Sequence, residues 1–497
     1  MVDPVEDSRS RPARRHSQIP VPRDLYRDAP LSWANASGLD LASPLDVQPL
    51  LHTIAATAGT SFHAAPLVAG DAQRGKAQSV RNPADLSVEV GTVVHADRDM
   101  IDRALDPAGN AQPAWDALGG EARAACLERL ADSLEELGPE LMGLIVGEAG
   151  RTIDDALSEL REAVDFCRYY AAQGRALFAR PRTLPGPTGE VNELSLHGRG
   201  TWVCISPWNF PLAIFTGQVA AALMAGNSVF AKPAEQTPLI AAEAVRLMWH
   251  AGIPRDVIQL LPGDGQVGAM LVADQRTSGV AFTGSTATAR HIHRQLADRE
   301  GAIAPLIAET GGLNVMLVDA TALPEQVVDD VITSAFRSAG QRCSALRVLC
   351  LQEDVADPVI EMLSGAMAEL RIGQPSALST DVGPVIDVTA RQRLERHVKF
   401  LEDQATLLAR CELDTDLPNG HYFAPQAWEI ERLGQLEGEV FGPILHVIRY
   451  DNDGLAGLIN DVNESGYGLT LGVHSRIDGF AREVFAATRV GNTYINR

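Results

Sequence analysis

The fold is decided by residues 201–211, Thr201-Trp202-Val203-Cys204-Ile205-Ser206-Pro207-Trp208-Asn209-Phe210-Pro211. The first five residues are a largely apolar run typical of a buried strand, and the two prolines end it in a turn. Four similar runs follow, at residues 228–231, 257–261, 280–282 and 305–308. Helical stretches separate them, notably 239–251 and 286–297. This alternation predicts an α/β fold with a doubly wound, Rossmann-like parallel sheet, in which ligands bind beyond the carboxyl ends of the strands.

A second alternation of strands and helices begins at residue 315. We expect strands at 315–318 and 348–351, and helices at 325–337 and 358–370. They predict a second α/β domain. Upstream, the patterns predict a helix at 50–58, a strand at 87–94, and helices at 121–148 and 153–178. Residues 190–197 alternate in polarity and predict an exposed ribbon, which either packs on another subunit or forms a solvated hairpin.

The composition argues against several classes of protein. Asp and Glu number 64 against 42 Lys and Arg, and the net charge of −22 disfavours nucleic acid and anionic membranes as partners. The six cysteines show neither a disulfide framework nor zinc spacing, so we expect reduced thiols, a cytoplasmic protein and no metal site. Residues 200–231 carry no charge, but prolines and asparagines interrupt them, which argues against membrane insertion.

A polar loop lies at the start of the second domain and reads Gly340-Gln341-Arg342-Cys343-Ser344-Ala345-Leu346-Arg347. A thiol is nucleophilic as its thiolate, and nearby cations lower its pKa. The loop therefore predicts a reactive Cys343 activated by Arg342 and Arg347. The alternative for a lone cysteine is an inert, buried, small apolar residue.

Polar residues follow the first two strands. The Asn209 amide needs no pKa adjustment and suits an oxyanion at a strand end, the alternative being a helix cap. Lys232 and Glu235 are spaced to hydrogen-bond the two hydroxyls of a ribose, where a carboxylate disfavours a 2′-phosphate. Taken alone, this pair also fits a surface salt bridge.

Two glycine-containing turns are candidates for phosphate binding. Gly263-Asp264-Gly265-Gln266-Val267-Gly268 matches G-x-G-x-x-G, but the acidic residue expected about 20 positions on is missing. Phe282-Thr283-Gly284-Ser285-Thr286 is the alternative, because Ser285 opens a helix whose N-terminal amides suit a pyrophosphate.

Two acidic residues complete the candidate site. Glu309 follows an apolar strand, where partial desolvation would give the raised pKa that a general base for water needs. The alternative is a strand-end acid that caps or pairs locally. Glu439 and Phe441 supply an acid and an aromatic ring suited to a nicotinamide ribose and its ring.

Taken in order, these motifs resemble the NAD(P)-dependent aldehyde dehydrogenase superfamily, from about residue 81 to the C-terminus. The interval between Glu309 and Cys343, 343 − 309 = 34 residues, agrees with the spacing of its acid and nucleophile. The resemblance implies that Cys343 is the nucleophile, that Asn209 and the Cys343 amide hold the oxyanion, and that Glu309 activates water. It also implies NAD as cofactor. The adenosine ribose would lie at Lys232 and Glu235, the pyrophosphate at Ser285, and the nicotinamide riboside at Glu439 and Phe441. Further contacts with the cofactor are implied at Ile205, Ser206, Pro207, Trp208, Gly265, Gly268, Phe282, Thr283, Gly284 and Gly311.

Residues 19–26, 198–203 and 340–347 resemble more narrowly the L-glutamate γ-semialdehyde (1-pyrroline-5-carboxylate) dehydrogenase domain of bifunctional proline-utilisation proteins. This likeness implies oxidation of L-glutamate γ-semialdehyde to L-glutamate, with the substrate α-carboxylate at Ser344 and Arg342 beside it. The alternative for Ser344 is a small residue chosen for packing. The implied domains are an N-terminal arm and helix at 1–60, an NAD-binding domain at 61–182 and 199–308, an oligomerisation-type hairpin at 183–198, and a catalytic domain at 309–497.

Members of that family continue past the strand at 493–496, with a loop that anchors the aldehyde and a strand that pairs across a dimer. We therefore expect a C-terminally truncated chain that comes from a longer polypeptide with a flavin-dependent proline dehydrogenase domain. The alternatives are a dehydrogenase for another aldehyde, transfer of the thioester to coenzyme A, and a non-catalytic NAD-binding fragment.

Overall fold

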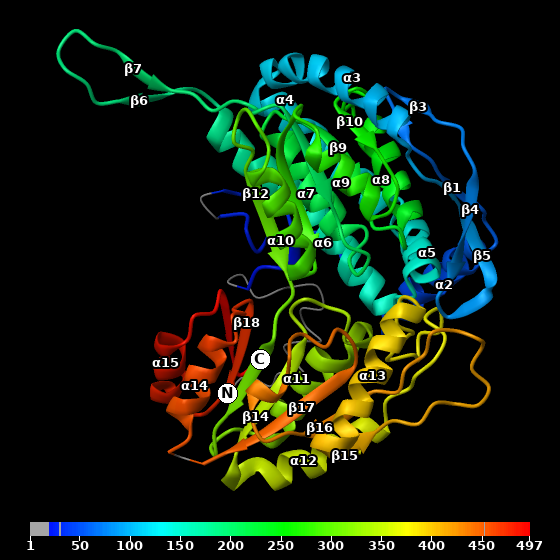
Figure 1. The fold of residues 1–497 in the computed structure, drawn as a ribbon, viewed down its shortest axis with the longest axis vertical. Helices are drawn as coiled ribbons and strands as arrows, with labels where there is room; N and C mark the ends of the chain where they lie inside the picture. Colours follow the sequence, from blue (N-terminus) through cyan, green and yellow to red (C-terminus); the bar gives the residue numbers. More distant parts are fainter. Residues whose placement is uncertain (1–18, 29–30, 452) are drawn as a thin grey trace, which may run out of the picture.

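The computed structural model describes residues 19–28, 31–451 and 453–497, and it contains two seven-stranded sheets, one in each half of the molecule (Figure 1). The first sheet has the order β12-β11-β8-β9-β10-β2-β3. Its first five strands are parallel, and β2 joins them antiparallel to β10. Their bounds are β8 (Thr201–Ile205), β9 (Ser228–Lys232), β10 (Ile258–Leu260), β11 (Thr277–Gly284), β12 (Leu306–Thr310), β2 (Leu67–Val68) and β3 (Asp71–Ala72).

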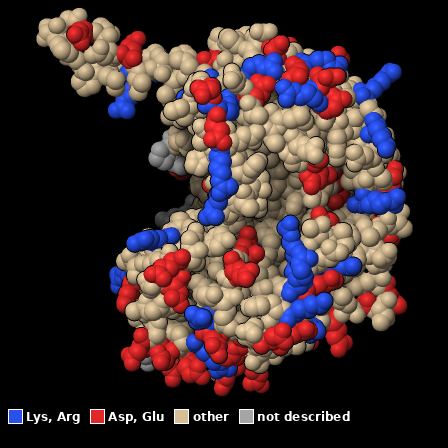
Figure 2. Space-filling model, in the orientation of Figure 1, with Lys and Arg blue, Asp and Glu red and all other residues tan. Residues whose placement is uncertain are grey.

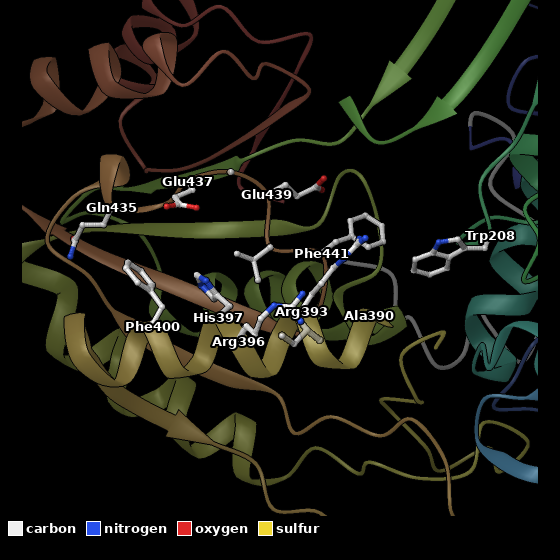
Figure 3. Close-up of a pocket in the computed structure, with 13 residues that line it drawn as sticks. Trp208, Ala390, Arg393, Arg396, His397, Phe400, Gln435, Glu437, Glu439 and Phe441 are labelled. Carbon is white, nitrogen blue, oxygen red and sulfur yellow. The ribbon is translucent and has the colours of Figure 1, made fainter. Parts of the chain in front are cut away.

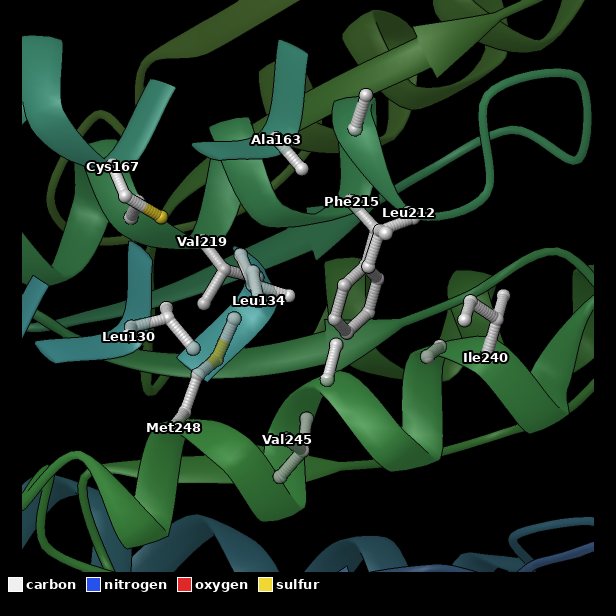
Figure 4. Packing of buried hydrophobic residues seen from close by; sticks show 14 of the residues in the cluster. Leu130, Leu134, Ala163, Cys167, Leu212, Phe215, Val219, Ile240, Val245 and Met248 are labelled. Atoms are coloured by element: carbon white, nitrogen blue, oxygen red, sulfur yellow. The ribbon is translucent and has the colours of Figure 1, made fainter. Parts of the chain in front are cut away.

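Helices cover both faces of the first sheet, which confirms the predicted doubly wound architecture. One core holds α4 (Gly119–Glu136), α5 (Gly138–Ala149), α6 (Ile153–Phe178), α7 (Ala213–Met224) and α8 (Pro238–His250). The other holds α3 (Arg98–Ala117), α9 (Gly265–Ala273) and α10 (Thr286–Ala297). In the first core Phe215 is fully buried among side chains from neighbouring helices, including Leu134 and Ile240 (Figure 4). This apolar burial holds the helix layer on the sheet.

The structure corrects two predictions. The single helix predicted at 121–148 is wrong, because Leu137, with φ −93° and ψ 16°, leaves helical geometry between α4 and α5. Pro139 then stands in the first turn of α5, where its missing amide hydrogen removes no helical hydrogen bond. The run at 305–308 forms β12, but β12 is the edge of the sheet and Ile307 is 58% exposed instead of buried.

A buried acid, Glu148 of α5, joins that helix to α8. Its carboxylate accepts the amides of Leu239 at 2.6 Å and Ile240 at 2.9 Å. Burial raises the pKa of Glu148 from 4.5 to about 8. The folded state therefore holds a proton that the unfolded chain releases between those pH values, so this contribution to stability is largest in acid and is lost as the pH rises towards 8.

We accordingly expect Glu148→Gln to flatten the decrease in unfolding free energy between about pH 5 and pH 8. At the acid end the variant should lose about 1 kcal/mol, because an NH2 group replaces one of the two carboxyl oxygens that face the Leu239 and Ile240 amides. Denaturant unfolding at several pH values measures both effects. An unchanged pH slope would contradict the assignment of this titration to Glu148.

The second sheet has the order β15-β16-β17-β14-β13-β18-β19, and all its strands are parallel except β15. The predicted second α/β alternation is confirmed, and the chain enters this sheet from β12 through residues 311–313. The strands are β13 (Asn314–Val318), β14 (Leu346–Gln352), β15 (Thr406–Arg410), β16 (Gln426–Glu429), β17 (Ile444–Tyr450), β18 (Thr470–His474) and β19 (Asn492–Ile495). The helices are α11 (Pro324–Phe336), α12 (Glu353–Ala368), α13 (Val388–Gln404), α14 (Leu455–Glu464) and α15 (Asp478–Ala487).

A hairpin of β6 (Arg182–Leu184) and β7 (Asn192–Leu194) projects from the first half (Figure 1). Its tip exposes apolar surface, since Val191 is 82% exposed. Asp116 anchors the base of the hairpin by accepting the Gly198 amide at 2.9 Å. The ribbon predicted at 190–197 is thus a hairpin strand, and its role in oligomerisation stays a prediction.

At the N-terminal side, α2 (Pro44–Ala58) contains the predicted helix at 50–58. A small sheet joins β1 (Phe62–Ala64), β5 (Asp85–Val94) and β4 (Ala77–Asn82), and β5 confirms the strand predicted at 87–94. The first 18 residues of the predicted arm lie outside the described residues. Within the described ranges, no helix is long and apolar enough to cross a membrane, and no group of His, Cys, Asp and Glu is arranged to hold a metal ion.

Candidate active site

The face of the molecule shown in Figure 2 is hollowed between the two halves, with acidic and basic side chains interspersed around the hollow. Cys343 belongs to the second half, where its loop connects α11 to β14. Immediately before it, Ser338, Ala339 and Gly340 have φ values of 58°, 52° and 64°. Three consecutive left-handed residues, two of them not glycine, are costly, so the surrounding contacts must hold this loop in place.

The charges around Cys343 contradict the predicted activation of its thiol. The Arg342 guanidinium lies 2.6 Å from Asp155, and the Arg347 guanidinium lies 3.3 Å from Glu439, so carboxylates balance both cations. The pKa of Cys343 is raised above 9.0, first by burial and then by the negative charge of Glu439. The prediction that adjacent arginines lower this pKa is therefore wrong for the protein without ligands.

Because Glu439 opposes ionisation of Cys343, we expect Glu439→Gln to make the thiol more reactive. Below the thiol pKa, alkylation by iodoacetamide follows the thiolate fraction, so removing the opposing charge should make modification roughly threefold faster. Mass spectrometry of the Cys343 peptide across pH measures it. Glu437→Gln is the matched control, since Glu437 is an exposed acid of the same loop. Equal rates in both variants would contradict the electrostatic assignment.

Helix α6 positions the two loops of the site through acids one turn apart. Asp155 binds Arg342 of the cysteine loop. Glu159 accepts the amides of Leu212 at 2.7 Å and Ala213 at 3.3 Å, where α7 begins just after the Asn209 turn. Sequence patterns missed both acids, because a buried acid inside an amphipathic helix resembles a solvated one until its partners are known.

Asn209 and the cysteine loop are in direct contact. The Asn209 side-chain amide donates to the Gln341 carbonyl at 3.1 Å, across 132 residues of sequence. A second amide, Asn314 of β13, donates to the Cys343 carbonyl at 2.7 Å and to the Ala345 carbonyl at 2.8 Å. Sequence analysis missed this function of Asn314, although the residue directly follows the Gly311-Gly312-Leu313 turn.

Cys343 and Glu309 line one cavity of about 610 Å³ between the two sheets. Most of its lining is apolar, including Phe166 and Tyr170 of α6 and Leu469 of the second half. Glu309 lies near the end of edge strand β12 and is exposed, which contradicts the expected desolvation of its carboxylate. The cavity brings a thiol and a carboxylate of different sheets to one apolar space, as an aldehyde substrate requires.

The candidate adenosine site lies at the ends of β8 and β9. The Ser206 amide donates to the Lys232 carbonyl at 3.1 Å, which places the two residues side by side. The Lys232 ammonium is buried and donates to the Pro233 carbonyl at 2.9 Å. Burial lowers the pKa of Lys232 to about 8, and the charges of Glu235 and Asp264 oppose that decrease. The Glu235 side chain, in contrast, is exposed and lies outside the buried surroundings of Lys232.

Both predicted phosphate turns open helices. Gly265 begins α9, and a Cβ there would meet open space, whereas Gly268 faces Lys232 and Ile205. Ser285 caps α10 by accepting the Thr288 amide at 3.2 Å. Both turns therefore remain candidates for binding a phosphate group. Of the neighbouring residues, Phe282 is buried, Gly284 packs against its ring, and the Thr283 hydroxyl accepts the Gln218 amide at 2.8 Å.

A second cavity, of about 530 Å³, is lined by Glu439 and Phe441, the two residues that Arg347 contacts. Trp208 reaches it from the first half, and α13 and the loop at 435–441 supply its other side (Figure 3). The rings of Trp208 and Phe441 meet edge to face, with centroids 5.5 Å apart. A Cβ on Gly311 would lie 1.7 Å from the Glu439 carboxylate, so any larger residue at that position would displace this carboxylate. This arrangement suits a flat ring and a hydroxylated sugar.

The two predicted substrate residues differ in their surroundings. Ser344 is exposed, and its carbonyl accepts the Thr470 hydroxyl at 3.4 Å. Arg342, in contrast, already binds Asp155 and donates to the Ser338 hydroxyl at 2.8 Å. Its side chain is therefore engaged with α6 and with its own loop.

The comparisons with known proteins agree with this geometry. The chain matches the aldehyde dehydrogenase family over residues 70–497. It is 48% identical over 492 residues to the bifunctional protein PutA of Klebsiella aerogenes, with 97% of this chain and 36% of that protein covered, so it spans about a third of that relative. It is 33% identical over 436 residues to the 1-pyrroline-5-carboxylate dehydrogenase of Anoxybacillus flavithermus, with 84% and 81% covered.

A crystal structure of 1-pyrroline-5-carboxylate dehydrogenase from Thermus with bound NAD is 28% identical and gives a TM-score of 0.89. It covers 94% of this chain, and the chain covers 91% of it. The family match includes both sheets except strand β2, and it covers the Asn209 turn and the Cys343 loop. The chain belongs to the aldehyde dehydrogenase family.

Proposed function

We propose that this chain oxidises L-glutamate γ-semialdehyde, the open form of 1-pyrroline-5-carboxylate, to L-glutamate with NAD. The observation that carries the proposal is that Cys343 and Glu309 line the same largely apolar cavity. The names of the relatives that are 48% and 33% identical support the substrate. Two alternatives to this function are a dehydrogenase for another aldehyde and a non-catalytic NAD-binding fragment.

In this proposal the Cys343 thiolate attacks the aldehyde carbon and forms a carbon–sulfur bond. The carbonyl π electrons move to oxygen, and the oxyanion accepts hydrogen bonds from the Asn209 amide and the Cys343 backbone amide. Asn209 already lies within hydrogen-bonding distance of the cysteine loop. One N–H of this amide donates to the Gln341 carbonyl, and the other is the donor for the oxyanion.

NAD, when bound, supplies the hydride acceptor that converts the thiohemiacetal into a thioester. Lys232 and Glu235 would hold its adenosine ribose, and Ser285 with the α10 amides would hold the pyrophosphate. Glu439, Phe441 and Gly311 would hold the nicotinamide riboside, with Trp208 on the opposite side of that cavity. The fit is supported by the buried Lys232 ammonium and by the close approach of Gly311 to Glu439.

Glu309 then takes a proton from water, the hydroxide attacks the thioester carbonyl, and the Cys343 sulfur leaves as the thiolate. The exposure of Glu309 gives it access to water. This step favours hydrolysis over transfer to coenzyme A. We place the substrate α-carboxylate at Ser344, with Arg342 supporting the loop.

We further propose that the chain is one region of a longer cytoplasmic protein that also oxidises proline with a flavin. Its coverage of 36% of the PutA relative supports this view. The proposed domains are an arm and helix at 1–60, an NAD-binding domain at 61–182 and 199–308, an oligomerisation hairpin at 183–198, and a catalytic domain at 309–497. The two separate sheets support the boundary near residue 309.

The test is NADH formation over a panel of aldehydes, with this chain and the full-length polypeptide assayed in parallel. We expect the highest kcat/KM for L-glutamate γ-semialdehyde and no requirement for coenzyme A. Faster oxidation of an aldehyde without an α-carboxylate would overturn the substrate assignment. NAD binding by calorimetry without turnover in either polypeptide would favour the non-catalytic alternative.

A further inference from the structure

Arg347 is a fully buried arginine whose side chain joins two functional loops. One terminal nitrogen donates to the Gly340 carbonyl at 2.7 Å and to the Gly442 carbonyl at 3.2 Å. The other donates to the Arg342 carbonyl at 2.9 Å and to the Glu439 carboxylate at 3.3 Å. Its exposure is 0%, so all of these contacts are shielded from water.

The first loop held by Arg347 is the one that carries Cys343. Gly340 and Arg342 directly precede the nucleophile in the loop, and the guanidinium binds both of their carbonyls. Gly340 also ends the left-handed run, and a Cβ there would lie 2.3 Å from the Gly442 carbonyl. The planar guanidinium therefore stabilises a loop backbone whose left-handed φ values are unfavourable by themselves.

The second loop carries Glu439 and Phe441. Burial raises the pKa of Glu439, and the charge of Arg347 opposes that increase. The same guanidinium lies 5.2 Å from the centre of the Phe441 ring. Arg347 thus contacts both residues proposed for the nicotinamide riboside while it holds the backbone that leads into Cys343.

We propose that Arg347 is a positioning residue that couples occupancy of the ribose site at Glu439 to the reactivity of Cys343. The ligand in this inference, a ribose diphosphate, rests on the proposed function. Ribose hydroxyls that donate to Glu439 compete with the Arg347 guanidinium for its carboxylate, which lies 3.3 Å from that guanidinium. The guanidinium transmits the accompanying movement of Glu439 to the Gly340 and Arg342 carbonyls.

The test compares Cys343 alkylation by iodoacetamide with and without adenosine diphosphate ribose. This probe carries the ribose but no nicotinamide ring that would cover the thiol. In the unmodified protein we expect alkylation to be about fivefold faster with the probe, a typical size for coupling between sites. In Arg347→Met and Arg347→Lys the ratio should fall towards one, because neither side chain can bridge all four acceptors.

Arg123→Met is the matched control. Arg123 is also buried, donates to the carbonyls of Met224, Trp115 and Asp116, and lies 5.0 Å from a phenylalanine ring. It belongs to α4, away from the cysteine loop, so its loss should lower stability and leave the ratio unchanged. A purely structural role for Arg347 would give this same result.

Two results would overturn the proposal: a ratio of one in the unmodified protein, or an unchanged ratio in a folded Arg347 variant. The lysine variant keeps a cation beside Glu439, so it serves if the methionine variant does not fold. Two further measurements use the protein without substitutions: calorimetric binding of the probe, and the turnover that remains after alkylation of Cys343. Absence of binding, or turnover that survives alkylation of Cys343, would identify a failure of the proposed function instead.

Discussion

Cys343→Ala should abolish NADH formation from L-glutamate γ-semialdehyde, by roughly 10⁴-fold or more, because no covalent intermediate can form without the sulfur. Cys343 is the cysteine that lines the cavity shared with Glu309. The remaining cysteines, at positions 126, 167, 204, 350 and 411, are buried. Steady-state kinetics of the full-length protein gives the effect, and calorimetry with NAD establishes that the variant remains folded.

The matched control for this experiment is Cys126→Ala. Cys126 is buried on α4, where its sulfur accepts a hydrogen bond from Arg129. Its loss should change stability and leave kcat unchanged. Turnover that survives in Cys343→Ala would show that the thiol is not the nucleophile and would remove the basis of the proposed reaction.

Glu309→Gln should separate the two halves of the reaction. Acylation of Cys343 does not need the carboxylate, so we expect a rapid burst of about one NADH per site. Hydrolysis of the thioester then lacks its base, and the steady rate should fall by roughly 10²- to 10³-fold. Stopped-flow fluorescence of NADH resolves both phases, and mass spectrometry detects the acylated Cys343.

Glu300→Gln makes a suitable control, because Glu300 is an exposed acid in the turn before β12. It changes the net charge by the same amount and should leave both phases intact. If Glu309→Gln retains a normal steady rate, another group or water alone deprotonates the attacking water. A loss of the burst would instead assign Glu309 to acylation.

The sequence predicted the strands well because apolar runs and their polar ends are local patterns. Asn209 lies in the turn that follows β8, Lys232 ends β9 and Glu309 lies near the end of β12, so each lies at the ligand edge of the sheet. The break at Leu137 was missed because helical spacing continues on both sides of it. Strand ends therefore carried more reliable information than helix lengths did.

The electrostatic environment of Cys343 could not be predicted from local sequence patterns. Arg342 stands beside Cys343 in sequence, but its charge is balanced by Asp155, which is 187 residues away. Arg347 is likewise balanced by Glu439, 92 residues on. The sign of the Cys343 pKa shift depends on these distant partners, and no spacing rule within the loop contains them.

The left-handed backbone of Ser338 and Ala339 also limits how this enzyme can vary. Side chains branched at Cβ, such as valine and isoleucine, clash with the backbone at positive φ, so they are excluded from the two positions. Glycine would relieve the strain, yet it would free the backbone just ahead of the nucleophile. Heat tolerance and catalytic precision thus place opposite demands on these two residues, and selection for one will tend to erode the other.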